Sequence, residues 1–413
     1  MKVLFVSYGG GHIQMCLPVM RALRRLKPTI ELELMALTTA FAVARDFGEP
    51  AFGYRDFCAS EDRSRIDAYG RRLLQGETHP SVSEDESLAY LGINFAEQVD
   101  ELGEERAWDR WKRFGRQGFL PTNFFQRVLT RIKPDMVVTT NSPRSEEAAV
   151  AAASALGIPS LSMLDLFALE TDPFLQRAVY ADRLTVLSDA TKKNLVTAGF
   201  DANRIFVTGN PAFDALLTPQ AAQAGEDFRR AKGWEHKNVV LWAGDLEAAN
   251  ALPAELAGAG LARLVQDRLV SWIKSRNDVA LIVRYHPNEW HLFQPIEGVP
   301  RVHWSQPDIE PLLPLLLASD QVVVQISTVG VQAHIAGKHL VNIGFSPYVR
   351  STGLDYSQFG MSQIADNPEM LIERLAQGTT AGRAGCTAAA ENDSAAHAVA
   401  SQIYALLEQR SAL

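Results

Sequence analysis

The chain has 413 residues, with 40 Lys and Arg against 48 Asp and Glu, and a formal net charge of −8. This length exceeds one ordinary domain and predicts two domains of roughly 200 residues each. The hydrophobic share of 47% and the charged share of 21% are typical of a folded globular protein, and they exclude disordered and collagen-like classes. The acidic balance argues against nucleic acid as a partner, because phosphate backbones are bound mainly through Lys and Arg.

Three cysteines, Cys16, Cys58 and Cys386, are too few for a disulfide framework, and their spacing matches no zinc-ligand pattern. They favour a reducing compartment. The first residues lead directly into a strand-like segment without the apolar core of a signal peptide. No apolar stretch reaches the length of about 18 residues that a membrane-spanning helix needs. We therefore expect a cytoplasmic protein.

Short apolar runs rich in β-branched residues alternate with longer helical patterns along the whole chain, as in parallel sheets with crossover helices. The predicted fold class is α/β. The first half contains six predicted strands, at 2–7, 30–36, 135–140, 158–163, 183–188 and 204–209. The second half contains four, at 238–244, 279–285, 321–326 and 339–344.

A polar stretch rich in Ala and Gln, at about 217–236, separates the two series of strands and predicts a connection between domains. The predicted first domain is 1–215, with a helical elaboration at about 60–130, and the predicted second domain is 216–375. The final segment, 376–413, has a helical pattern and no strand after it. It either caps the second domain or crosses back to the first.

Segment 106–133 combines eight basic residues and six aromatic ones with a single acidic residue, Asp109. Such a mixture is able to lie on an anionic membrane, here peripherally at the inner face, or to hold an acceptor. The alternative is that the aromatic side chains pack into the first domain while the charges are solvated. The rarity of interfacial helices favours this second interpretation.

The first predicted strand is followed by Gly9, Gly10, Gly11 and His12, and then by an apolar helical pattern. Glycines allow a ligand to approach the backbone closely, and the start of the helix offers free N–H groups at the edge where open α/β sheets bind ligands. Dinucleotide binding is disfavoured, because Gln14 stands at the third glycine position of GxGxxG. His12 is placed to act as a general base on a hydroxyl; alternatively it only hydrogen-bonds the loop.

A histidine base is more effective when a carboxylate orients its second ring nitrogen. Asp165, shortly after the strand at 158–163, is the preferred candidate for this role. Glu170 and Asp172 lie a few residues further on and remain alternatives.

Polar residues also follow the strand at 135–140, namely Asn141, Ser142 and Arg144. A helical pattern begins directly after them. These residues either line the binding site or cap that helix.

In the second half, a strand ends at a polar turn that contains Ser327, Thr328 and Gly330 and leads into a helix. Hydroxyls and free helix N–H groups suit phosphate oxygens without any metal, although Ser and Thr also cap many ordinary helices. Two other parallel strands end in Gly244-Asp245 and in Arg284-Tyr285-His286-Pro287. Three strand ends with polar or glycine residues therefore favour a diphosphate site.

The pattern YGGGHIQMCLPVMRAL at 8–23 is similar to the opening strand, loop and helix of UDP-sugar transferases of the GT-B architecture. The matching residues are Gly11, His12 and Pro18, and the resemblance implies that His12 is the catalytic base. The stretch at 181–216, which ends in TGNPAFDAL, resembles the end of the N-terminal domain in UDP-N-acetylglucosamine 2-epimerases. The string STVGVQAHIAGKHLVNIG at 327–344 resembles the donor-binding helix of surface-polysaccharide transferases, which implies that Ser327, Thr328 and Gly330 bind the nucleotide diphosphate.

The chain departs from the epimerases at three elements. Their Arg-Pro-Glu after the first strand is absent, their His-Val-Glu-Ala-Gly would fall near 162–167 where no Glu stands, and their Asp-Ser-Gly-Gly is replaced at 327–330. The donor-like stretch at 327–344 contains no glutamate, so it offers no clear Glu-x7-Glu pattern of the retaining transferases. Inverting transfer is therefore the main hypothesis.

The resemblance implies two Rossmann-like domains facing across a cleft, and a metal-independent transfer of a sugar from a nucleotide-diphosphate donor, preferably a UDP-sugar, with no cofactor. The acceptor is a glycan, a lipid-linked molecule or a small molecule. Alternative hypotheses are a UDP-N-acetylglucosamine 2-epimerase-like enzyme and a non-catalytic nucleotide-sugar-binding accessory protein. The predicted site consists of His12 and Asp165 for catalysis, Gly10, Gly11 and Asn141 at the acceptor, and Gly244, Arg284, His286, Ser327, Thr328 and Gly330 at the donor.

Overall fold

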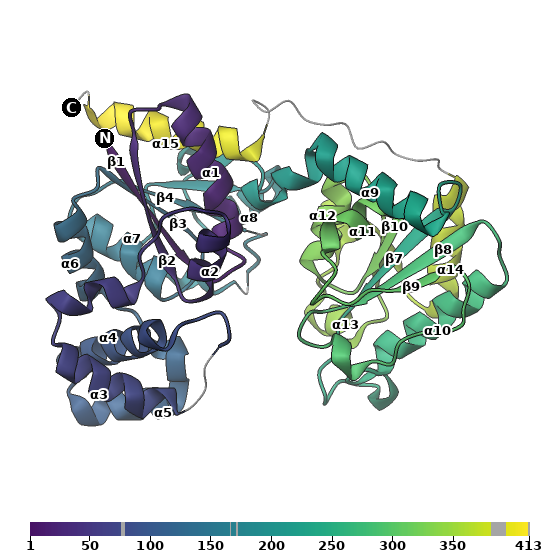
Figure 1. Cartoon of the computed structure of the whole chain (residues 1–413), viewed down its shortest axis with the longest axis horizontal. Coiled ribbons are helices and arrows are strands. Elements are labelled where there is room, and N and C mark those ends of the chain that lie inside the picture. The colour runs from purple at the N-terminus through teal and green to yellow at the C-terminus, as the bar shows by residue number, and fades with distance from the viewer. Residues whose placement is uncertain (76–78, 166, 171, 381–393, 412–413) are drawn as a thin grey trace. The chain divides into compact units, whose positions relative to one another are not determined.

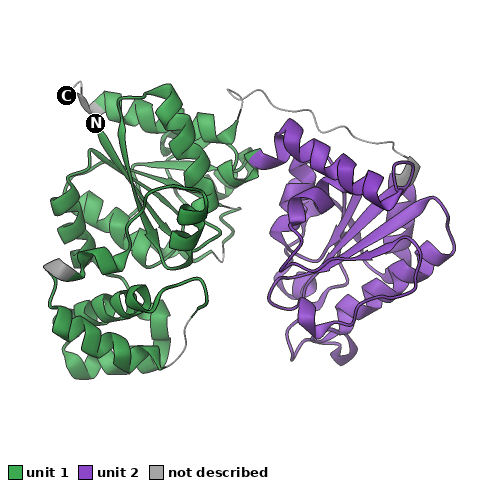
Figure 2. Ribbon diagram, in the orientation of Figure 1, with its two compact units in different colours: residues 1–214, 390–413 green, residues 215–389 purple. Residues whose placement is uncertain are grey.

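The structure is a computed structural model that describes residues 1–75, 79–165, 167–170, 172–380 and 394–411. The chain divides into two compact units (Figure 2). Unit 1 comprises Met1–Asp214 and Ala390–Leu413, and unit 2 comprises Ala215–Ala389. Each unit contains a six-stranded sheet whose paired strands all run parallel, with helices packed against it (Figure 1). The predicted α/β class is confirmed.

The sheet of unit 1 has the strand order β2-β1-β3-β4-β5-β6. Successive residues of β1 enter opposite cores, since Leu4 and Val6 belong to one hydrophobic cluster while Val3 and Phe5 belong to another. This alternation follows from the two-residue period of a strand, and it explains why the strand is apolar throughout. The strands are β1 (Lys2–Tyr8), β2 (Glu31–Leu37), β3 (Met136–Thr140), β4 (Ser160–Met163), β5 (Arg183–Val186) and β6 (Ile205–Val207).

Helix α15 (Ala395–Ser411) belongs to unit 1, so the chain returns to its first domain after completing the second. It packs against α1 through a shared apolar core that includes Val399 and Ile403. The carboxylate of Asp214 accepts the backbone N–H groups of Ala395 and Ala396, at 3.0 and 2.8 Å, and thereby caps the start of the helix. The other helices beside the sheet are α1 (Ile13–Leu26), α2 (Thr39–Asp46), α7 (Ser145–Ala155) and α8 (Asp189–Thr197).

The strand-poor region of unit 1 forms helices α3 (Arg63–Leu74), α4 (Glu84–Leu102), α5 (Glu104–Phe114) and α6 (Thr122–Ile132). Helices α3 and α4 pack so closely that a Cβ on Gly92 would lie 2.2 Å from the carbonyl oxygen of Ile66.

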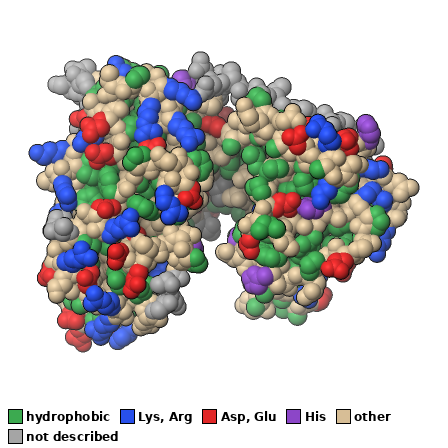
Figure 3. Space-filling view, in the orientation of Figure 1, with side chains coloured by type: hydrophobic (Ala, Val, Ile, Leu, Met, Phe, Trp, Pro, Cys, Tyr) green, Lys and Arg blue, Asp and Glu red, His purple; other side chains and the backbone are tan. Residues whose placement is uncertain are grey.

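Most aromatic residues of 106–133 are buried or packed against this core, as the packing interpretation expects, although Phe114 is 48% exposed. Figure 3 shows basic side chains over the end of unit 1 that carries α3 and α5, with acidic ones among them. Arg127, for example, pairs with Glu61 and Glu97. Membrane contact through 106–133 stays a prediction.

The sheet of unit 2 has the order β12-β11-β10-β7-β8-β9. Its outermost strands, β9 (Val302–Trp304) and β12 (Gln363–Ala365), were not predicted, because their sequences VHW and QIA include polar residues and do not form an apolar run. The inner strands are β7 (Asn238–Gly244), β8 (Val279–Tyr285), β10 (Gln321–Val324) and β11 (His339–Ile343). The helices are α9 (Pro219–Lys232), α10 (Gly260–Lys274), α11 (Leu312–Ala318), α12 (Thr328–Ile335), α13 (Pro347–Thr352) and α14 (Pro368–Thr380).

Within the ranges described above, no helix is both long enough and apolar enough to cross a bilayer. Cys16 and Cys58 are buried as free thiols, and Cys386 lies outside the described residues.

Candidate functional site

The carboxyl edge of the unit 1 sheet carries strained backbone. Three residues other than glycine have a positive φ after successive strands: Thr38 (57°) after β2, Arg144 (68°) after β3 and Ala168 (47°) after β4. Such conformations cost of order 1–3 kcal/mol each and concentrate at functional sites. The strain therefore points to the edge at which His12 lies.

Thr140, the last residue of β3, links His12 to a buried carboxylate. Its hydroxyl oxygen lies 2.8 Å from His12 Nδ1 and donates to Glu146 Oε2 at 2.6 Å. The other oxygen of Glu146 accepts the backbone N–H of Tyr8 at 2.7 Å, and Oε2 also accepts that of Thr140 at 2.6 Å. Because the Thr140 hydroxyl gives its proton to Glu146, it accepts from His12 Nδ1–H. In a neutral His12 ring this places the proton on Nδ1 and leaves Nε2 without one.

Glu146 is completely buried, and burial raises the pKa of its carboxyl, while the charge of His12 and the hydrogen bonds of Thr140 and Tyr8 oppose that rise. Both carboxyl oxygens already accept N–H or O–H donors, so a proton on either oxygen would face a donor. The ionised form is therefore the one that this environment satisfies. An ionised Glu146 also stabilises the positive charge that His12 acquires when it takes a proton.

The expected pairing of Asp165 with His12 is not found among the described residues. Asp165 instead exchanges hydrogen bonds with Asn141: Asn141 Nδ2 donates to Asp165 Oδ1 at 2.9 Å, and the Asp165 N–H donates to Asn141 Oδ1 at 3.3 Å. Asn210 Nδ2 donates to the carbonyl of Asp165 at 2.9 Å. Asp165 therefore ties the end of β4 to that of β3, whereas Glu146 orients His12. Glu146 was missed because it follows its strand by six residues, although its place in the first turn of α7 returns it to the strand end.

The glycines between β1 and α1 have separate roles. Gly9 has φ +92°, a conformation that side chains rarely adopt. The Gly10 N–H donates to Thr39 Oγ1 at 2.9 Å and so fastens the loop to α2. A Cβ on Gly11 would meet no atom within 4 Å, so the loop is open to solvent at Gly11, next to His12.

In unit 2, Gln325 joins two strand ends. Its Oε1 accepts the N–H of Asp245 at 2.8 Å, and its Nε2 donates to the carbonyl of Asp245 at 3.2 Å and to Glu247 Oε1 at 3.0 Å. Glu247 is buried and also accepts the N–H of Tyr348 at 3.0 Å. These bonds fix the loop after β7 against the end of β10.

The turn before α12 is braced by Tyr356. The Tyr356 hydroxyl accepts the N–H of Ser327 at 3.1 Å and donates to the Ser327 carbonyl. Ser327 Oγ accepts the N–H of Val329 at 3.3 Å, so it acts as the cap of α12, and Thr328 is exposed at the first helical position. A Cβ on Gly330 would lie 2.4 Å from the Tyr356 ring, which accounts for glycine there. A phosphate role for these residues stays a prediction.

Two of the predicted donor residues have internal roles. Arg284 is only 8% exposed, and its Nη1 donates to Ser305 Oγ and to the Glu310 carbonyl, at 2.6 and 2.7 Å. Ser305 follows β9, on the side of β8 away from β10, so the guanidinium is directed away from Ser327. A Cβ on Gly244 would lie 2.7 Å from the Trp242 ring, so packing of aromatic rings requires this glycine.

Asp245, His286 and Glu289 form a cluster whose ligand atoms all lie within 4.8 Å of one another, close enough to hold one metal ion. The backbone N–H of Asn288 donates to His286 Nδ1 at 3.2 Å. Burial raises the pKa of Asp245 to about 6; His286 opposes this rise, and the carboxylates of Glu289 and Glu247 add to it. The predicted metal independence stays a prediction.

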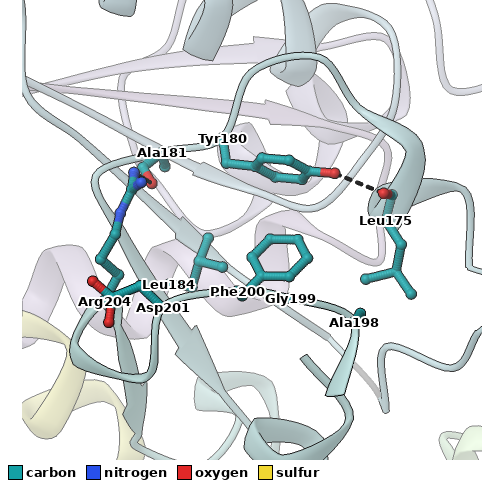
Figure 4. A pocket seen from close by; sticks show the side chains of 9 residues that line it. All are labelled: Leu175, Tyr180, Ala181, Leu184, Ala198, Gly199, Phe200, Asp201 and Arg204. Atoms are coloured by element: carbon teal, nitrogen blue, oxygen red, sulfur yellow. Dashed lines mark hydrogen bonds between the residues drawn. The ribbon is translucent and has the colours of Figure 1, made fainter. Parts of the chain in front are cut away.

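A cavity of about 400 Å³ in unit 1 lies elsewhere (Figure 4). Tyr180 and Phe200 contribute aromatic rings to it, and the Tyr180 hydroxyl donates to the Leu175 carbonyl at 2.8 Å. Ala181 and Arg204, also in its lining, precede β5 and β6. The cavity therefore opens at the amino ends of strands, opposite the edge that carries His12.

Comparison with known proteins relates this geometry to a family. Residues 178–359 match the sequence family described as UDP-N-acetylglucosamine 2-epimerase. This range contains most of the stretch at 181–216 on which the resemblance was based, and it includes the carboxyl-edge residues of unit 2. A search of curated proteins finds no match.

Solved structures match over almost the whole chain. The UDP-GlcNAc 2-epimerase from Methanocaldococcus jannaschii is 16% identical with a TM-score of 0.63, covering 98% of this chain and 100% of its own. This chain has the GT-B fold. The UDP-GlcNAc 2-epimerase from Neisseria meningitidis, bound to UDP-GlcNAc, is 16% identical with a TM-score of 0.58 and coverages of 99% and 100%. The wall teichoic acid polymerase TagF is 12% identical with a TM-score of 0.53 and coverages of 99% and 90%. The suspected similarity to GT-B proteins and to 2-epimerases is confirmed.

Proposed function

We propose that this chain is an enzyme of the UDP-N-acetylglucosamine 2-epimerase type, which acts on a UDP-sugar. The observation that carries the proposal is the family match over 178–359, because that range contains the polar strand ends of unit 2. The sequence hypothesis preferred glycosyl transfer and held epimerisation as its alternative. The family match reverses that order.

His12 supplies the base for this reaction. Inversion at C2 requires the C2–H bond to break and to re-form on the other face. Because this hydrogen is weakly acidic, the step is assisted when the C1–O bond to the diphosphate breaks at the same time: the proton goes to His12 Nε2, the C–H electrons form a C1=C2 bond, and UDP leaves. Return of UDP to C1 and of a proton from solvent to the other face of C2 completes the inversion, and His12 gives its proton to solvent. Glu146, through Thr140, stabilises the protonated His12.

Inverting glycosyl transfer is the second candidate. It is favoured by the three epimerase elements that the sequence lacks and by the single base that the His12, Thr140 and Glu146 arrangement provides. In transfer, His12 takes the proton of an acceptor hydroxyl, that oxygen bonds to C1, and the C1–O bond to the diphosphate breaks. The sugar C2–H bond stays intact.

Incubation with UDP-GlcNAc in D2O separates the two reactions. Epimerisation predicts deuterium at C2 and a second, 2-epimeric UDP-sugar, which NMR and mass spectrometry detect. Transfer predicts UDP release that depends on an added acceptor, with hydrogen retained at C2. Binding of UDP-GlcNAc without either reaction would contradict an enzymatic role and leave the accessory protein.

His12→Asn is the decisive variant, and His236→Asn, which changes an exposed histidine of unit 2, is its matched control. We expect the first to lose about 100-fold or more in turnover and the second to lose nothing. Full activity of His12→Asn would refute the assigned base. The same reactions with EDTA test the predicted metal independence.

A further inference from the structure

Arg144 is a half-buried arginine at the edge that carries His12. It follows β3 by four residues and has φ +68°, and its guanidinium carbon lies 4.6 Å from the centre of the Tyr8 ring. The Tyr90 ring packs against Tyr8 with centroids 5.8 Å apart, which fixes the platform under the guanidinium. Tyr8 is also the residue whose N–H donates to Glu146.

The guanidinium has no ion pair and no hydrogen bond within the described chain, and its Nε is buried without an acceptor. The nearby carboxylates already serve other groups. Glu146 holds Thr140 and Tyr8, Glu147 pairs with Arg177 at 3.3 Å, and Asp165 is bonded to Asn141. A cation–π contact compensates only part of the desolvation of a half-buried cation.

Arg144 also does not cap α7. It occupies the N-cap position, yet its side chain makes no capping hydrogen bond there. Of the two roles that the sequence left open, capping or lining the site, the structure retains the second. A strained backbone that holds an unpaired guanidinium over an aromatic ring is typical of a preorganised anion site.

We propose that Arg144 binds an oxyanion of the molecule that reacts at His12. The oxyanion is a carboxylate or a phosphate, because both accept two parallel hydrogen bonds from one guanidinium. The proposal rests on the proposed function, which places a UDP-sugar at this edge. It adds that unit 1 recognises a negative charge, either on the diphosphate or as a carboxylate on the sugar or acceptor.

The test compares wild-type protein with Arg144→Gln by titration calorimetry, using free pyrophosphate and free glucuronate as probes. Arg72→Gln is the matched control, since Arg72 also lies over an aromatic ring, 3.8 Å from the centre of Trp108. We expect Arg144→Gln to bind one of the two probes about tenfold or more weakly than wild type, and the control to bind both probes as wild type does. Weaker binding of pyrophosphate identifies the oxyanion at Arg144 as a phosphate, and weaker binding of glucuronate identifies it as a carboxylate.

Wild-type and Arg144→Gln proteins that bind both probes equally, or not at all, would overturn the proposal. Melting temperatures of both proteins check that they are folded. Because the probes contain no nucleotide and undergo no reaction, this result is independent of whether UDP-GlcNAc is epimerised. Failure of the proposed function and failure of the Arg144 site are thus separate observations.

Discussion

Asp245 provides a test of the unit 2 site that needs no substrate. Its carboxyl is largely buried next to Glu289 and Glu247 and makes no hydrogen bond within the described chain. The change from its ordinary pKa of 3.8 to about 6 corresponds to about 3 kcal/mol, because one pKa unit is about 1.4 kcal/mol. The substitution Asp245→Asn removes the charge and loses no bond.

The raised pKa of Asp245 determines how the stability gained by Asp245→Asn changes with pH. Above pH 6 the Asp245 carboxyl is ionised in both the folded and the unfolded chain, so the folded protein bears the whole cost of burying the charge. Below pH 3.8 it is protonated in both states, and the cost is absent. Asp245→Asn should therefore be more stable than wild type by about 3 kcal/mol at pH 8 and by about half of that at pH 5.

The measurement is thermal unfolding of both proteins by calorimetry across this pH range, with EDTA present so that no cation occupies the cluster. A gain of about 3 kcal/mol should raise the melting temperature of a unit this size by roughly 6–12 °C at pH 8. Glu247→Gln is the control, and it should be destabilised at every pH because Glu247 accepts hydrogen bonds from Gln325 and Tyr348. An Asp245→Asn protein whose advantage does not shrink between pH 8 and pH 5 would refute the reasoning.

Three further predictions concern unit 1 and the metal. Thr140→Val should lower turnover by about 100-fold, and the proton of a neutral His12 should no longer be confined to Nδ1, which nitrogen NMR detects. Thr140→Ser keeps the hydroxyl and should have normal turnover and the Nδ1–H tautomer. Normal activity of Thr140→Val would exclude the link from His12 to Glu146. Arg144→Gly should relieve the backbone strain of the positive φ and raise the melting temperature, with a gain of at most about 2 kcal/mol in the free energy of unfolding. The same variant should lose anion binding. A lower melting temperature would mean that the Arg144 side chain stabilises the fold by packing. EDTA should leave turnover unchanged, and loss of activity that Mn²⁺ restores would instead assign a metal to Asp245, His286 and Glu289.

The strands were predictable because burial on both faces makes them continuous apolar runs. Each of the ten predicted strands overlaps a strand of the structure, whereas β9 and β12 are partly exposed, include polar residues and were not predicted. The predicted start of the second domain at 216 lies next to the observed division after Asp214. Whether the last helix returns to the first domain was left open, because α15 is held by tertiary contacts with α1 and by Asp214, and neither contact leaves a local pattern.

Site residues were harder to predict, because a residue type fixes what a side chain is able to do but not where it points. The place of His12 was predicted, since a polar residue after a strand lies at the carboxyl edge of an α/β sheet, and its role as a base stays a prediction. The carboxylate linked to His12 was not predicted, because Glu146 and Asp165 both follow neighbouring strands. Only the direction of α7 brings Glu146, and not Asp165, to Thr140 and His12. Arg284 fits a phosphate site by type, yet its guanidinium turns to Ser305.

Each candidate site holds one charged group that makes no hydrogen bond within the described chain, and the two groups have opposite charge. Among the described residues, Arg144 in unit 1 is a cation whose guanidinium has no ion pair or hydrogen bond, whereas Asp245 in unit 2 is an acid whose carboxyl has no hydrogen bond. A diphosphate bound at the carboxyl edge of unit 2 repels an ionised Asp245, so binding favours the protonated carboxyl and raises its pKa further.

UDP binding should therefore take up protons when the pH lies above 6, and its affinity should fall as the pH rises. Titration calorimetry of UDP at pH 7 in buffers with different ionisation enthalpies measures this uptake directly. Asp245→Asn should bind UDP more tightly than wild type at pH 7 and take up fewer protons. Equal proton uptake by both proteins would place the diphosphate away from Asp245, and with it away from the ends of β7 and β8.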